Sequence, residues 1–430
     1  MSVVTITPAV HGLRGTFTVP GDKSIAHRAL LLGAIARGPT VVHGFASGAD
    51  NRATLAACES LGVAVTARDG ALHIDGRGWD GLRAPATTLD CRNSGTTMRL
   101  LAGMLAGRPF VSRLDGDASL RRRPMRRVLE PLARMGASII AEGADGRAPL
   151  RVEGRPLRGA THVLPIASAQ VKSALLLAGL QASGTTTVEE PASSRDHTER
   201  MLAEFGTRLT RGPRAVTLAG PQELRGANVR LPGDFSSAAF LIVAALLVPG
   251  SELRLTDVGV NPTRTGLLDV LAAMGASVLV EPEVGNGTEP RATLIVRSVP
   301  LRAARIGGEL LLRAIDEFPI LCVAAACAAG RSELRDAAEL RAKESDRIAV
   351  MAETLARLGA HVEELPDGLT IEGPTRFAGG LVDSHGDHRI AMAAAIAALV
   401  ATAPVTISDA DCADVSFPGF YDLLAKAGGQ

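Results

Sequence analysis

Basic side chains stand where the sequence predicts the start of an apolar helix, a place that ordinarily favours acidic residues. The stretch Pro20-Gly-Asp-Lys-Ser-Ile-Ala-His-Arg28 puts Lys23, His27 and Arg28 at or near such a start. The first turn of a helix exposes N–H groups and carries a partial positive charge, so a cation there is unfavourable unless an anion offsets it. The N–H groups and the cations could together hold a phosphate or a carboxylate. The same side chains could also point into water.

Ionisable residues recur directly before or within apolar runs along the rest of the chain. Besides the first cluster, they are Arg99, Lys172, Asp316, Glu317, His388 and Arg389. Partly buried charges need partners or a ligand. These acids and bases could pair with one another, or they could grip the phosphate and carboxylate groups of a substrate.

Another dense group of charges lies in the segment Leu340-Arg-Ala-Lys-Glu-Ser-Asp-Arg-Ile348. If this segment is helical, Lys343 and Arg347 share one face at positions i and i+4, with Glu344 beside them. An exposed helix with internal salt bridges would explain the pattern. Together with the other clusters, it indicates cations that bind an anion and an acid that moves a proton.

The spacing of glycines and cysteines argues against several familiar sites. No G-x-x-x-x-G-K-S/T motif surrounds Gly21-Asp-Lys-Ser24 and no G-x-G-x-x-G follows an early strand, so neither an ATPase nor a dehydrogenase is supported. The five cysteines form no C-x-x-C pair and have no histidine at metal-ligand spacing. We therefore expect reduced thiols and no metal.

The composition describes a chain with a large core and no overall charge. Of 430 residues 46% are hydrophobic and only 3% aromatic, which favours two or three domains of helices packed closely on sheets. The formal charge of +1 draws the protein to neither nucleic acid nor membrane. The N-terminus has no secretory signal and no apolar run reaches the ~20 residues of a membrane span, so we expect a soluble, cytoplasmic protein.

The elements that must position the charged residues recur in six units. A helix that stops at a glycine and continues into a strand is repeated five times, and we count Ala427-Gly-Gly429 as a sixth, truncated copy. The five glycines are Gly62, Gly136, Gly206, Gly275 and Gly359. Between them, each unit begins another helix that is hydrophobic all round and therefore buried. The unit is roughly βαβαββ, which predicts an α/β (α+β) protein.

Three such units in each half of the chain predict two domains. The boundary lies near Leu231-Pro232-Gly233, which gives a first domain of residues 20–230 and a second of residues 1–19 and 231–430. The N-terminal residues would supply the strand that the truncated unit lacks. Parallel buried helices would gather their N-termini at one end of each half, and a substrate cleft between the domains is expected.

The chain resembles the 5-enolpyruvylshikimate-3-phosphate synthases over essentially its whole length. The matching motifs are Pro20-Gly-Asp-Lys-Ser24, Asn93-Ser-Gly-Thr-Thr-Met-Arg99, Arg123-Pro124, Ser168-Ala-Gln170, Ser194-Arg-Asp-His197, Asp316-Glu-Phe-Pro319, Lys343-Glu-Ser-Asp-Arg347 and Asp387-His-Arg389. The family's enolpyruvyl transferase fold has two domains of three βαβαββ units, in agreement with the repeats. The resemblance implies transfer of the enolpyruvyl group of phosphoenolpyruvate to the 5-hydroxyl of shikimate 3-phosphate. Phosphate would be released without metal or cofactor, in chorismate and aromatic amino acid biosynthesis.

The resemblance also implies a role for individual residues. Shikimate 3-phosphate would be bound by Lys23, Ser24, Arg28, Ser168, Gln170, Ser194, Arg195, Asp316 and Lys343. Phosphoenolpyruvate would be bound by Lys23, Gly95, Arg123, Gln170, Glu344, Arg347 and Arg389. Asp316 would help to take the 5-hydroxyl proton and Glu344 would protonate the methylene carbon, with Lys23 as the competing acid or base.

Two positions depart from the family's common pattern. Some members have Ser-Ser-Gln where this chain has Ser168-Ala-Gln170, and Arg195 would replace the lost phosphate contact. Some members also have a lysine where this chain has Val415, so the phosphate contact of that lysine is not assigned here.

Two other functions compete with this one. The related transferase that acts on UDP-N-acetylglucosamine shares fold and donor, but its other signatures are missing. A repeat protein that binds RNA through Arg121-Arg-Arg123 is opposed by the near-zero charge and the few aromatic residues. We expect small-molecule substrates, no nucleic acid or membrane partner, and a monomer.

Overall fold

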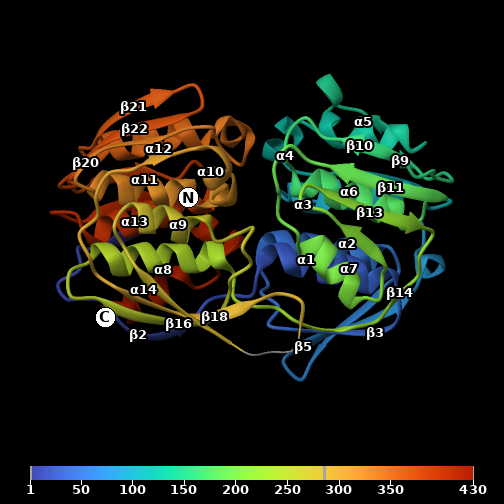
Figure 1. Cartoon of the computed structure of the whole chain (residues 1–430), viewed down its shortest axis with the longest axis horizontal. Coiled ribbons are helices and arrows are strands. Elements are labelled where there is room, and N and C mark those ends of the chain that lie inside the picture. Colours follow the sequence, from blue (N-terminus) through green and yellow to red (C-terminus); the bar gives the residue numbers. More distant parts are fainter. Residues whose placement is uncertain (1, 284–286, 430) are drawn as a thin grey trace. The chain divides into compact units, whose positions relative to one another are not determined.

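The computed structural model describes residues 2–283 and 287–429, and the chain divides into two compact units of mixed helices and sheets (Figure 1). Unit 1 comprises Met1–Pro20, Pro232–Gly285 and Pro290–Gln430. Unit 2 comprises Gly21–Leu231 and Asn286–Glu289. In the described parts of the chain, no helix combines the length and the apolar character needed to cross a membrane.

The centre of unit 2 is built from three helices that are apolar nearly all round: α1 (Lys23–Ile35), α3 (Gly95–Leu105) and α6 (Ala169–Gly179). Helices α3 and α6 approach closely at Gly103, where an added Cβ would lie 2.1 Å from the carbonyl oxygen of Ala174. Only glycine fits there. The outer helices of the unit are α2 (Ala49–Ser60), α4 (Ala118–Arg122), α5 (Arg126–Arg134) and α7 (His197–Glu204).

Three mixed sheets surround these helices in unit 2. Their orders are β6-β7-β9-β8, β10-β11-β13-β12 and β14-β3-β5-β4, with β15 also paired to β3. The last strands of the unit, β14 and β15, run parallel to β3, so the end of the third repeat completes the sheet of the first. The strands are β3 (Ala36–His43), β4 (Ala64–Arg68), β5 (Ala71–Arg77), β6 (Leu89–Asp90), β7 (Val111–Asp115), β8 (Ser138–Ala141), β9 (Leu150–Glu153), β10 (Thr161–Val163), β11 (Gly184–Glu189), β12 (Leu209–Arg211), β13 (Ala215–Gly220), β14 (Leu224–Arg225) and β15 (Asn228–Arg230).

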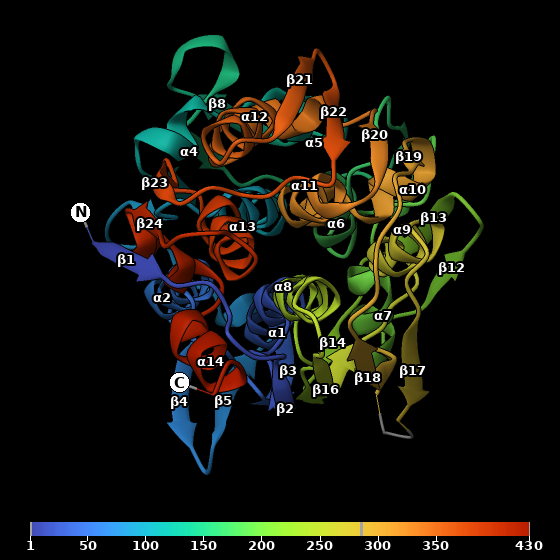
Figure 2. The same ribbon diagram turned by 90° about the vertical axis from the view of Figure 1, so that its left-hand side faces the viewer.

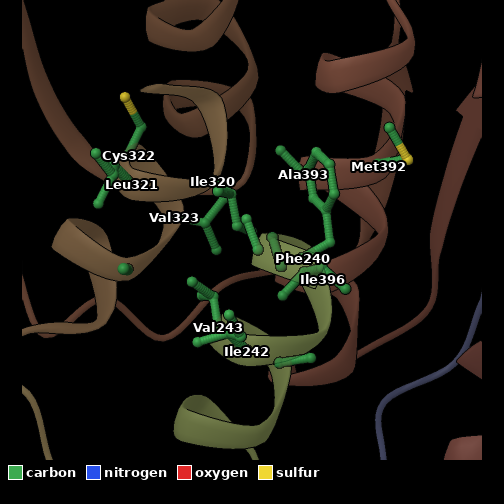
Figure 3. Close-up of a cluster of buried hydrophobic side chains, with 14 of the residues drawn as sticks. Phe240, Ile242, Val243, Ile320, Leu321, Cys322, Val323, Met392, Ala393 and Ile396 are labelled. Carbon is green, nitrogen blue, oxygen red and sulfur yellow. The ribbon is translucent and has the colours of Figure 1, made fainter. Parts of the chain in front are cut away.

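Unit 1 repeats this plan around α8 (Phe235–Leu247), α11 (Phe318–Cys327) and α13 (His388–Leu399). Figure 2 looks along these three helices, with the sheets of the unit outside them. Their side chains interlock in one core, where Phe240, Ile320 and Ile396 are among the buried residues (Figure 3). The remaining helices are α9 (Gly266–Ala273), α10 (Gly308–Arg313), α12 (Arg347–Arg357) and α14 (Phe420–Ala427).

The N-terminal residues complete the sheets of unit 1. Strand β1 (Val3–Ile6) pairs antiparallel with β24 (Val405–Ser408), and β2 (Arg14–Thr18) pairs parallel with β16 (Glu252–Gly259). The predicted N-terminal strand of the truncated sixth repeat is therefore confirmed. The sheet orders are β1-β24-β23, β17-β18-β16-β2 and β19-β20-β22-β21. The other strands are β17 (Val278–Pro282), β18 (Arg291–Arg297), β19 (Arg305–Ile306), β20 (Gly330–Leu334), β21 (His361–Leu365), β22 (Gly368–Gly373) and β23 (Gly380–Asp383).

The repeated glycines end the outer helices as the sequence predicts. The five glycines have φ between +84° and +93°, a region that other residues rarely adopt: Gly62, Gly136, Gly206, Gly275 and Gly359. Each glycine therefore turns the chain out of a helix and toward the following strand.

Candidate active site

The N-termini of α8 and α11 in unit 1 meet at the buried Arg264, and Arg389 at the start of α13 reaches them through Glu317, at 4.0 Å, and the backbone carbonyl of Asp316. Asp234, Glu317 and Asp387 are the N-cap residues of α8, α11 and α13. The guanidinium of Arg264 lies 3.2 Å from Asp234 and 3.9 Å from Glu317. The convergence expected from parallel buried helices is thus present in unit 1, and it concentrates the positive ends of three helices.

Asp316, just before α11, stands among four cationic side chains, which lie 3.7–4.0 Å from its carboxylate: Arg264, Lys343, Arg347 and Arg389. These separations exceed a hydrogen-bond length, so the attraction is purely electrostatic. Arg389 instead donates a hydrogen bond of 2.7 Å to the backbone carbonyl of Asp316. Acids and bases therefore do pair here, as one of the two sequence interpretations allowed, with separations at Asp316 that are longer than a hydrogen bond.

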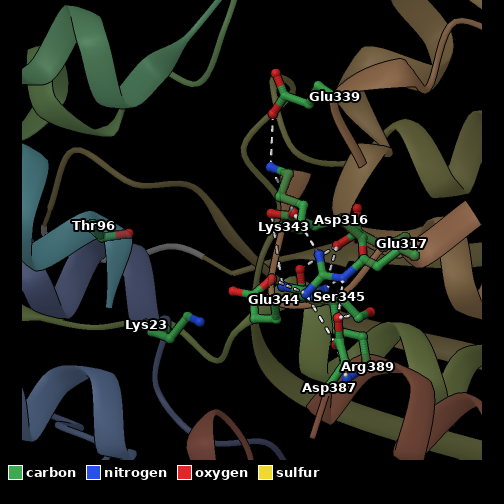
Figure 4. Close-up of polar contacts among 12 residues, drawn as sticks. Lys23, Thr96, Asp316, Glu317, Glu339, Lys343, Glu344, Ser345, Asp387 and Arg389 are labelled. Atoms are coloured by element: carbon green, nitrogen blue, oxygen red, sulfur yellow. Dashed lines mark hydrogen bonds and ion pairs between the residues drawn. The ribbon is translucent and has the colours of Figure 1, made fainter. Parts of the chain in front are cut away.

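Two carboxylates hold Arg347, those of Asp387 and Glu344, which are labelled in Figure 4. Its Nε lies 2.8 Å from Asp387 Oδ2, and its Nη2 lies 2.7 Å from Glu344 Oε2. Burial by itself lowers the pKa of Arg347, but the charges of Asp387 and Glu344 outweigh it and raise that pKa. Burial likewise raises the pKa of Asp387, and Arg347 more than reverses this, so the carboxyl pKa is lowered. Both groups are charged at neutral pH.

The segment 340–348 is not one helix, so the condition for Lys343 and Arg347 to share a helix face is not met. A short 3₁₀ turn covers Ala338–Ala342, and α12 begins only at Arg347. The reason is the cap: the carboxylate of Asp346 accepts a hydrogen bond of 3.1 Å from the backbone N–H of Ala349, which starts the helix there. Lys343 therefore does not share a helix face with Arg347, and its ammonium pairs with Glu339 at 2.8 Å.

In unit 2, Lys23 and Arg28 occupy the first two turns of α1. The helix is capped by Asp22, which accepts a hydrogen bond from the N–H of Ile25, and Lys23 pairs with Asp50 at 2.9 Å. Arg28 is buried and donates to the hydroxyl of Thr198 at 2.7 Å. Burial lowers the pKa of Arg28 to about 10, so its guanidinium is still charged at neutral pH.

Polar side chains join the starts of α3 and α6. Gln170 donates a hydrogen bond of 2.9 Å to Thr96 and accepts one from Arg99. Arg123 donates to the side chain of Asn93, directly before the cap of α3. Two guanidinium groups thus lie over the start of α3, close to Gly95, where an added Cβ would be 2.8 Å from Arg99 and 3.3 Å from Arg123.

Ser168 and Ser194 are linked through Lys172, which bonds both Glu190 and the backbone carbonyl of Ser194. Ser168 caps α6 by accepting from the N–H of Val171, and its own N–H donates to Glu190 at 2.9 Å. The hydroxyl of Ser194 is buried and has no hydrogen-bond partner among the residues that the structure describes. The charge of Arg195 contributes to the lowered pKa of Arg28, after burial, which places two like charges near each other.

The predicted site residues fall into two sets, one in each unit. Unit 2 holds Lys23, Ser24, Arg28, Gly95, Arg123, Ser168, Gln170, Ser194 and Arg195, and unit 1 holds Asp316, Lys343, Glu344, Arg347 and Arg389. Sequence reasoning missed Arg264, which is 2% exposed, because nothing in Asn261-Pro-Thr-Arg264 marks the arginine as buried. It also missed Asp50, the partner of Lys23, and Thr96, the partner of Gln170, because residues that meet from distant parts of the chain leave no local sequence pattern.

The basic run Arg121-Arg-Arg123 does not act as one patch. Arg121 is exposed and pairs with Asp115 at 2.6 Å, whereas Arg123 is buried. All five cysteines are free thiols. Within residues 2–283 and 287–429, no group of His, Cys, Asp and Glu is arranged to hold a metal ion.

Comparison with known proteins identifies the family. Residues 8–424 match the model of the family described as EPSP synthase (3-phosphoshikimate 1-carboxyvinyltransferase). The chain is 53% identical over 426 residues to 3-phosphoshikimate 1-carboxyvinyltransferase of Geobacter metallireducens, with 99% of both chains covered. It is 56% identical over 418 residues to the protein of the same name from Halorhodospira halophila, covering 97% of this chain and 94% of the relative.

Solved structures agree with this match. A structure of EPSP synthase from Acinetobacter baumannii superposes with a TM-score of 0.88 at 45% identity, covering 100% of this chain and 98% of that one. The enolpyruvyl transferase NikO of Streptomyces tendae, at 20% identity and a TM-score of 0.79 over 99% and 97% of the two chains, shows the same fold. The predicted two-domain enolpyruvyl transferase fold is confirmed, and the chain belongs to the EPSP synthase, or 3-phosphoshikimate 1-carboxyvinyltransferase, family.

Proposed function

We propose that the two groups of side chains described above carry out the family's reaction in this chain. As a member of the family, the chain transfers the enolpyruvyl group of phosphoenolpyruvate to shikimate 3-phosphate in aromatic amino acid biosynthesis. The observation that supports the residue roles is the gathering of cations and two carboxylates, Asp316 and Glu344, at the converging helix N-termini of unit 1.

Phosphoenolpyruvate is bound by Arg123, Arg347 and Arg389, together with Lys23, Gly95, Gln170 and Glu344. A guanidinium suits this ligand because its planar fork donates two parallel hydrogen bonds to a carboxylate or a phosphate. Arg347 is 2% exposed and fixed by Asp387, so it is oriented before the substrate arrives. Arg389 is held by a backbone carbonyl, which leaves further donors of its guanidinium for the ligand.

Shikimate 3-phosphate is bound by Lys23, Ser24, Arg28, Ser168, Gln170, Ser194 and Arg195 of unit 2, with Asp316 and Lys343 on the ring hydroxyls. The buried hydroxyl of Ser194 is the strongest single support, because an unpartnered buried hydroxyl is costly unless a ligand oxygen satisfies it. The proximity of Arg28 and Arg195 supports a dianionic phosphate, whose charge would offset their repulsion.

The reaction needs one proton to be delivered to carbon and two to be removed, one from the 5-hydroxyl and one from the new methyl group. Glu344, once it has taken up a proton, donates it to the methylene carbon of phosphoenolpyruvate, and the 5-hydroxyl oxygen attacks the adjacent carbon while Asp316 takes the hydroxyl proton. The tetrahedral adduct then loses phosphate, which carries away the proton held by Asp316, while the ionised Glu344 takes back a proton from the new methyl group and the double bond is restored. The neighbouring cations stabilise the charge that develops on the carboxylate and phosphate oxygens. Lys23 is the competing acid or base.

We further propose, from the sequence, that the chain is a cytoplasmic monomer. All the proposed binding residues belong to one chain, so no second copy has to complete a site. Sedimentation equilibrium at micromolar concentration tests this state. A stable dimer would contradict it.

Phosphate release measured with purified protein and a chelator tests the reaction and its metal independence together. Release is expected only when phosphoenolpyruvate and shikimate 3-phosphate are both present. UDP-N-acetylglucosamine in place of shikimate 3-phosphate serves as the control acceptor. Release that needs added metal, or that occurs with the control acceptor alone, would contradict the proposal.

A further inference from the structure

Lys172 lies in the interior of unit 2, where the proposed reaction gives it no role. Its ammonium is 2.7 Å from Glu190 Oε2 and 2.9 Å from Glu199 Oε1. The three side chains are only 4–5% exposed. Ion pairs removed from water in this way are weak contributors to stability, because the cost of desolvation offsets their attraction. The contacts of these three side chains with the backbone indicate instead that they hold two neighbouring segments in position.

The first element that this triad holds is the start of α6. Glu190 uses its second oxygen, Oε1, to accept a hydrogen bond of 2.9 Å from the backbone N–H of Ser168. Since Lys172 fixes the other oxygen of the same carboxylate, the position of Ser168 depends on Lys172 through one rigid group. Ser168 is the N-cap of α6 and one of the residues proposed to bind shikimate 3-phosphate.

The triad also holds the segment that carries Ser194 and Arg195. The ammonium of Lys172 donates to the backbone carbonyl of Ser194 at 3.5 Å, and Glu199 lies on the helix that follows this segment. The hydroxyl of Ser194 is buried without a hydrogen bond of its own, so nothing described orients that side chain except the backbone that carries it. Lys172 therefore fixes the positions of Ser168 and Ser194 relative to each other.

A parallel set of contacts ties the same helices to Arg28. Ser173, the neighbour of Lys172, accepts from Arg28 at 2.8 Å, and Thr198, the neighbour of Glu199, accepts from Arg28 at 2.7 Å. The hydroxyls of Ser173 and Thr198 are themselves 2.6 Å apart. Two adjacent links thus join α6 to α7, one through Lys172 and one through Arg28.

We propose that Lys172 is a positioning residue for shikimate 3-phosphate, which fixes Ser168 and Ser194 through Glu190 and Glu199 without touching the substrate. This inference rests on the proposed binding roles of the two serines. Burial alone lowers the pKa of Lys172, but Glu199 and Glu190 outweigh it and raise that pKa above its ordinary value. Lys172 therefore stays charged at neutral pH and does not exchange protons in the reaction.

The test compares two variants that change the charge in opposite directions. Lys172→Met removes a positive charge and Glu190→Met a negative one, with the same new side chain. If Lys172 and Glu190 acted only through their electric field, the first variant would weaken binding of the phosphate and the second would strengthen it. A positioning role requires both variants to raise the KM and the Kd for shikimate 3-phosphate. We expect a rise of about tenfold in each, as for the loss of one hydrogen bond to a charged group.

The remaining readouts separate positioning from a general loss of stability. The KM for phosphoenolpyruvate and kcat are expected to stay within about threefold of the original values, because the triad has no described contact with Arg123, Arg347 or Arg389. Leu177→Ala is the matched control: it lowers stability from within the same buried helix without touching the triad, so its KM for shikimate 3-phosphate is expected to be unchanged. Calorimetric titration of shikimate 3-phosphate gives the Kd on folded protein.

The outcomes that overturn the inference are specific. A Kd for shikimate 3-phosphate within twofold of the original in folded Lys172→Met, opposite shifts in the two methionine variants, or an equal rise in Leu177→Ala would each refute it. Where Glu190→Met does not fold, Glu190→Gln takes its place, because it keeps the shape and removes the negative charge; where Lys172→Met does not fold, Lys172→Gln takes its place, because it also removes the positive charge. Ser168→Ala and Ser194→Ala distinguish the proposed binding roles of the serines from the positioning role of Lys172. If neither serine variant raises the Kd for shikimate 3-phosphate, the binding roles fail. If both serine variants raise it and the triad variants do not, only the positioning role fails.

Discussion

Arg347 and Asp387 form a two-point ion pair in the interior of unit 1, with Nε 2.8 Å from Oδ2 and Nη2 3.2 Å from Oδ1. The same carboxylate caps α13 by accepting a hydrogen bond of 3.0 Å from the backbone N–H of Arg389. The hydroxyl of Ser345 adds a third contact at 3.0 Å. One buried acid therefore positions two of the guanidinium groups that we assign to phosphoenolpyruvate.

Asp387→Asn removes the charge of this carboxylate while keeping a residue that can cap a helix. Because the variant leaves Arg347 buried with less compensation, we expect the free energy of unfolding to fall by about 3 kcal/mol. The KM for phosphoenolpyruvate is expected to rise at least about tenfold, since the loss of a hydrogen bond to a charged group has that size. Urea unfolding and steady-state kinetics measure the two effects. Glu353→Gln, which breaks an exposed pair with Arg357, is the control and leaves both quantities near the original.

Glu344→Gln tests the proposed proton donor. The amide oxygen can still accept from Arg347, so both substrates are expected to bind with affinities within about threefold of the original, whereas kcat falls by about 10² to 10⁴. Substrate titration and single-turnover phosphate release distinguish binding from chemistry. Glu339→Gln removes a nearby charge from Lys343 without removing the donor and serves as the control. A kcat near the original in Glu344→Gln would exclude this residue and leave Lys23 as the acid.

Gly95→Ala tests the closeness of the backbone to the guanidinium groups above α3. The added methyl would meet Arg99 at 2.8 Å and Arg123 at 3.3 Å, both at the ends of flexible side chains. The side chains can move aside at little cost, so we expect a change of less than about 1 kcal/mol in the free energy of unfolding. Their displacement is expected to raise the KM for phosphoenolpyruvate several-fold. Gly428→Ala, where the new methyl meets nothing closer than 3.5 Å, provides the comparison, and a KM unchanged in Gly95→Ala would argue against the role of Gly95.

The fold was accessible from the sequence because its repeats leave a local pattern. The glycine that ends each outer helix adopts positive φ, so Gly62 and its counterparts mark the repeat. A helix that is apolar on all sides must be buried, so the central helices can be recognised without any knowledge of contacts. The completion of the last sheet by Val3–Ile6 followed from counting strands. The start of α12 was harder to place, because the segment 340–348 contains both helix-forming residues and a capping residue. Asp346 caps α12, so the helix begins at Arg347 and does not include Lys343.

From the sequence, the candidate site could be predicted only as a set of charged residues, without their contacts. The sequence places Lys172 or Asp316 beside an apolar helix, and burial of such a residue demands partners, but it does not say which partners. Arg264 meets Asp234 and Asp316 across 30 and 52 positions of the chain, and Lys172 meets Glu199 across 27. These choices depend on how the helices pack, which is a property of the folded unit and has no local signature.

His27 provides a test of burial through pH. Its ring is buried in α1, with Nδ1 2.7 Å from the hydroxyl of Thr54, while Nε2 has no hydrogen-bond partner among the described residues. Burial lowers its pKa from 6.5 to about 3, with Lys23 and Arg28 adding to the effect and Asp50 opposing it. The folded protein therefore keeps His27 neutral at pH values where the unfolded chain has already bound a proton.

The sign of the resulting pH dependence follows from that difference. Between pH 6.5 and 3 the unfolded state holds the extra proton, so acid favours unfolding, and the contribution of His27 falls by up to about 1.4 kcal/mol for each pH unit. His27→Gln does not titrate, so its stability relative to the original chain is expected to improve by about 2 kcal/mol between pH 7 and pH 5. Urea unfolding at pH 7, 6 and 5 measures this, with His361→Gln as the control for an exposed histidine. Parallel stability curves for His27→Gln and the original chain would mean that His27 binds its proton equally well in the folded and unfolded states, and would contradict a pKa lowered by burial.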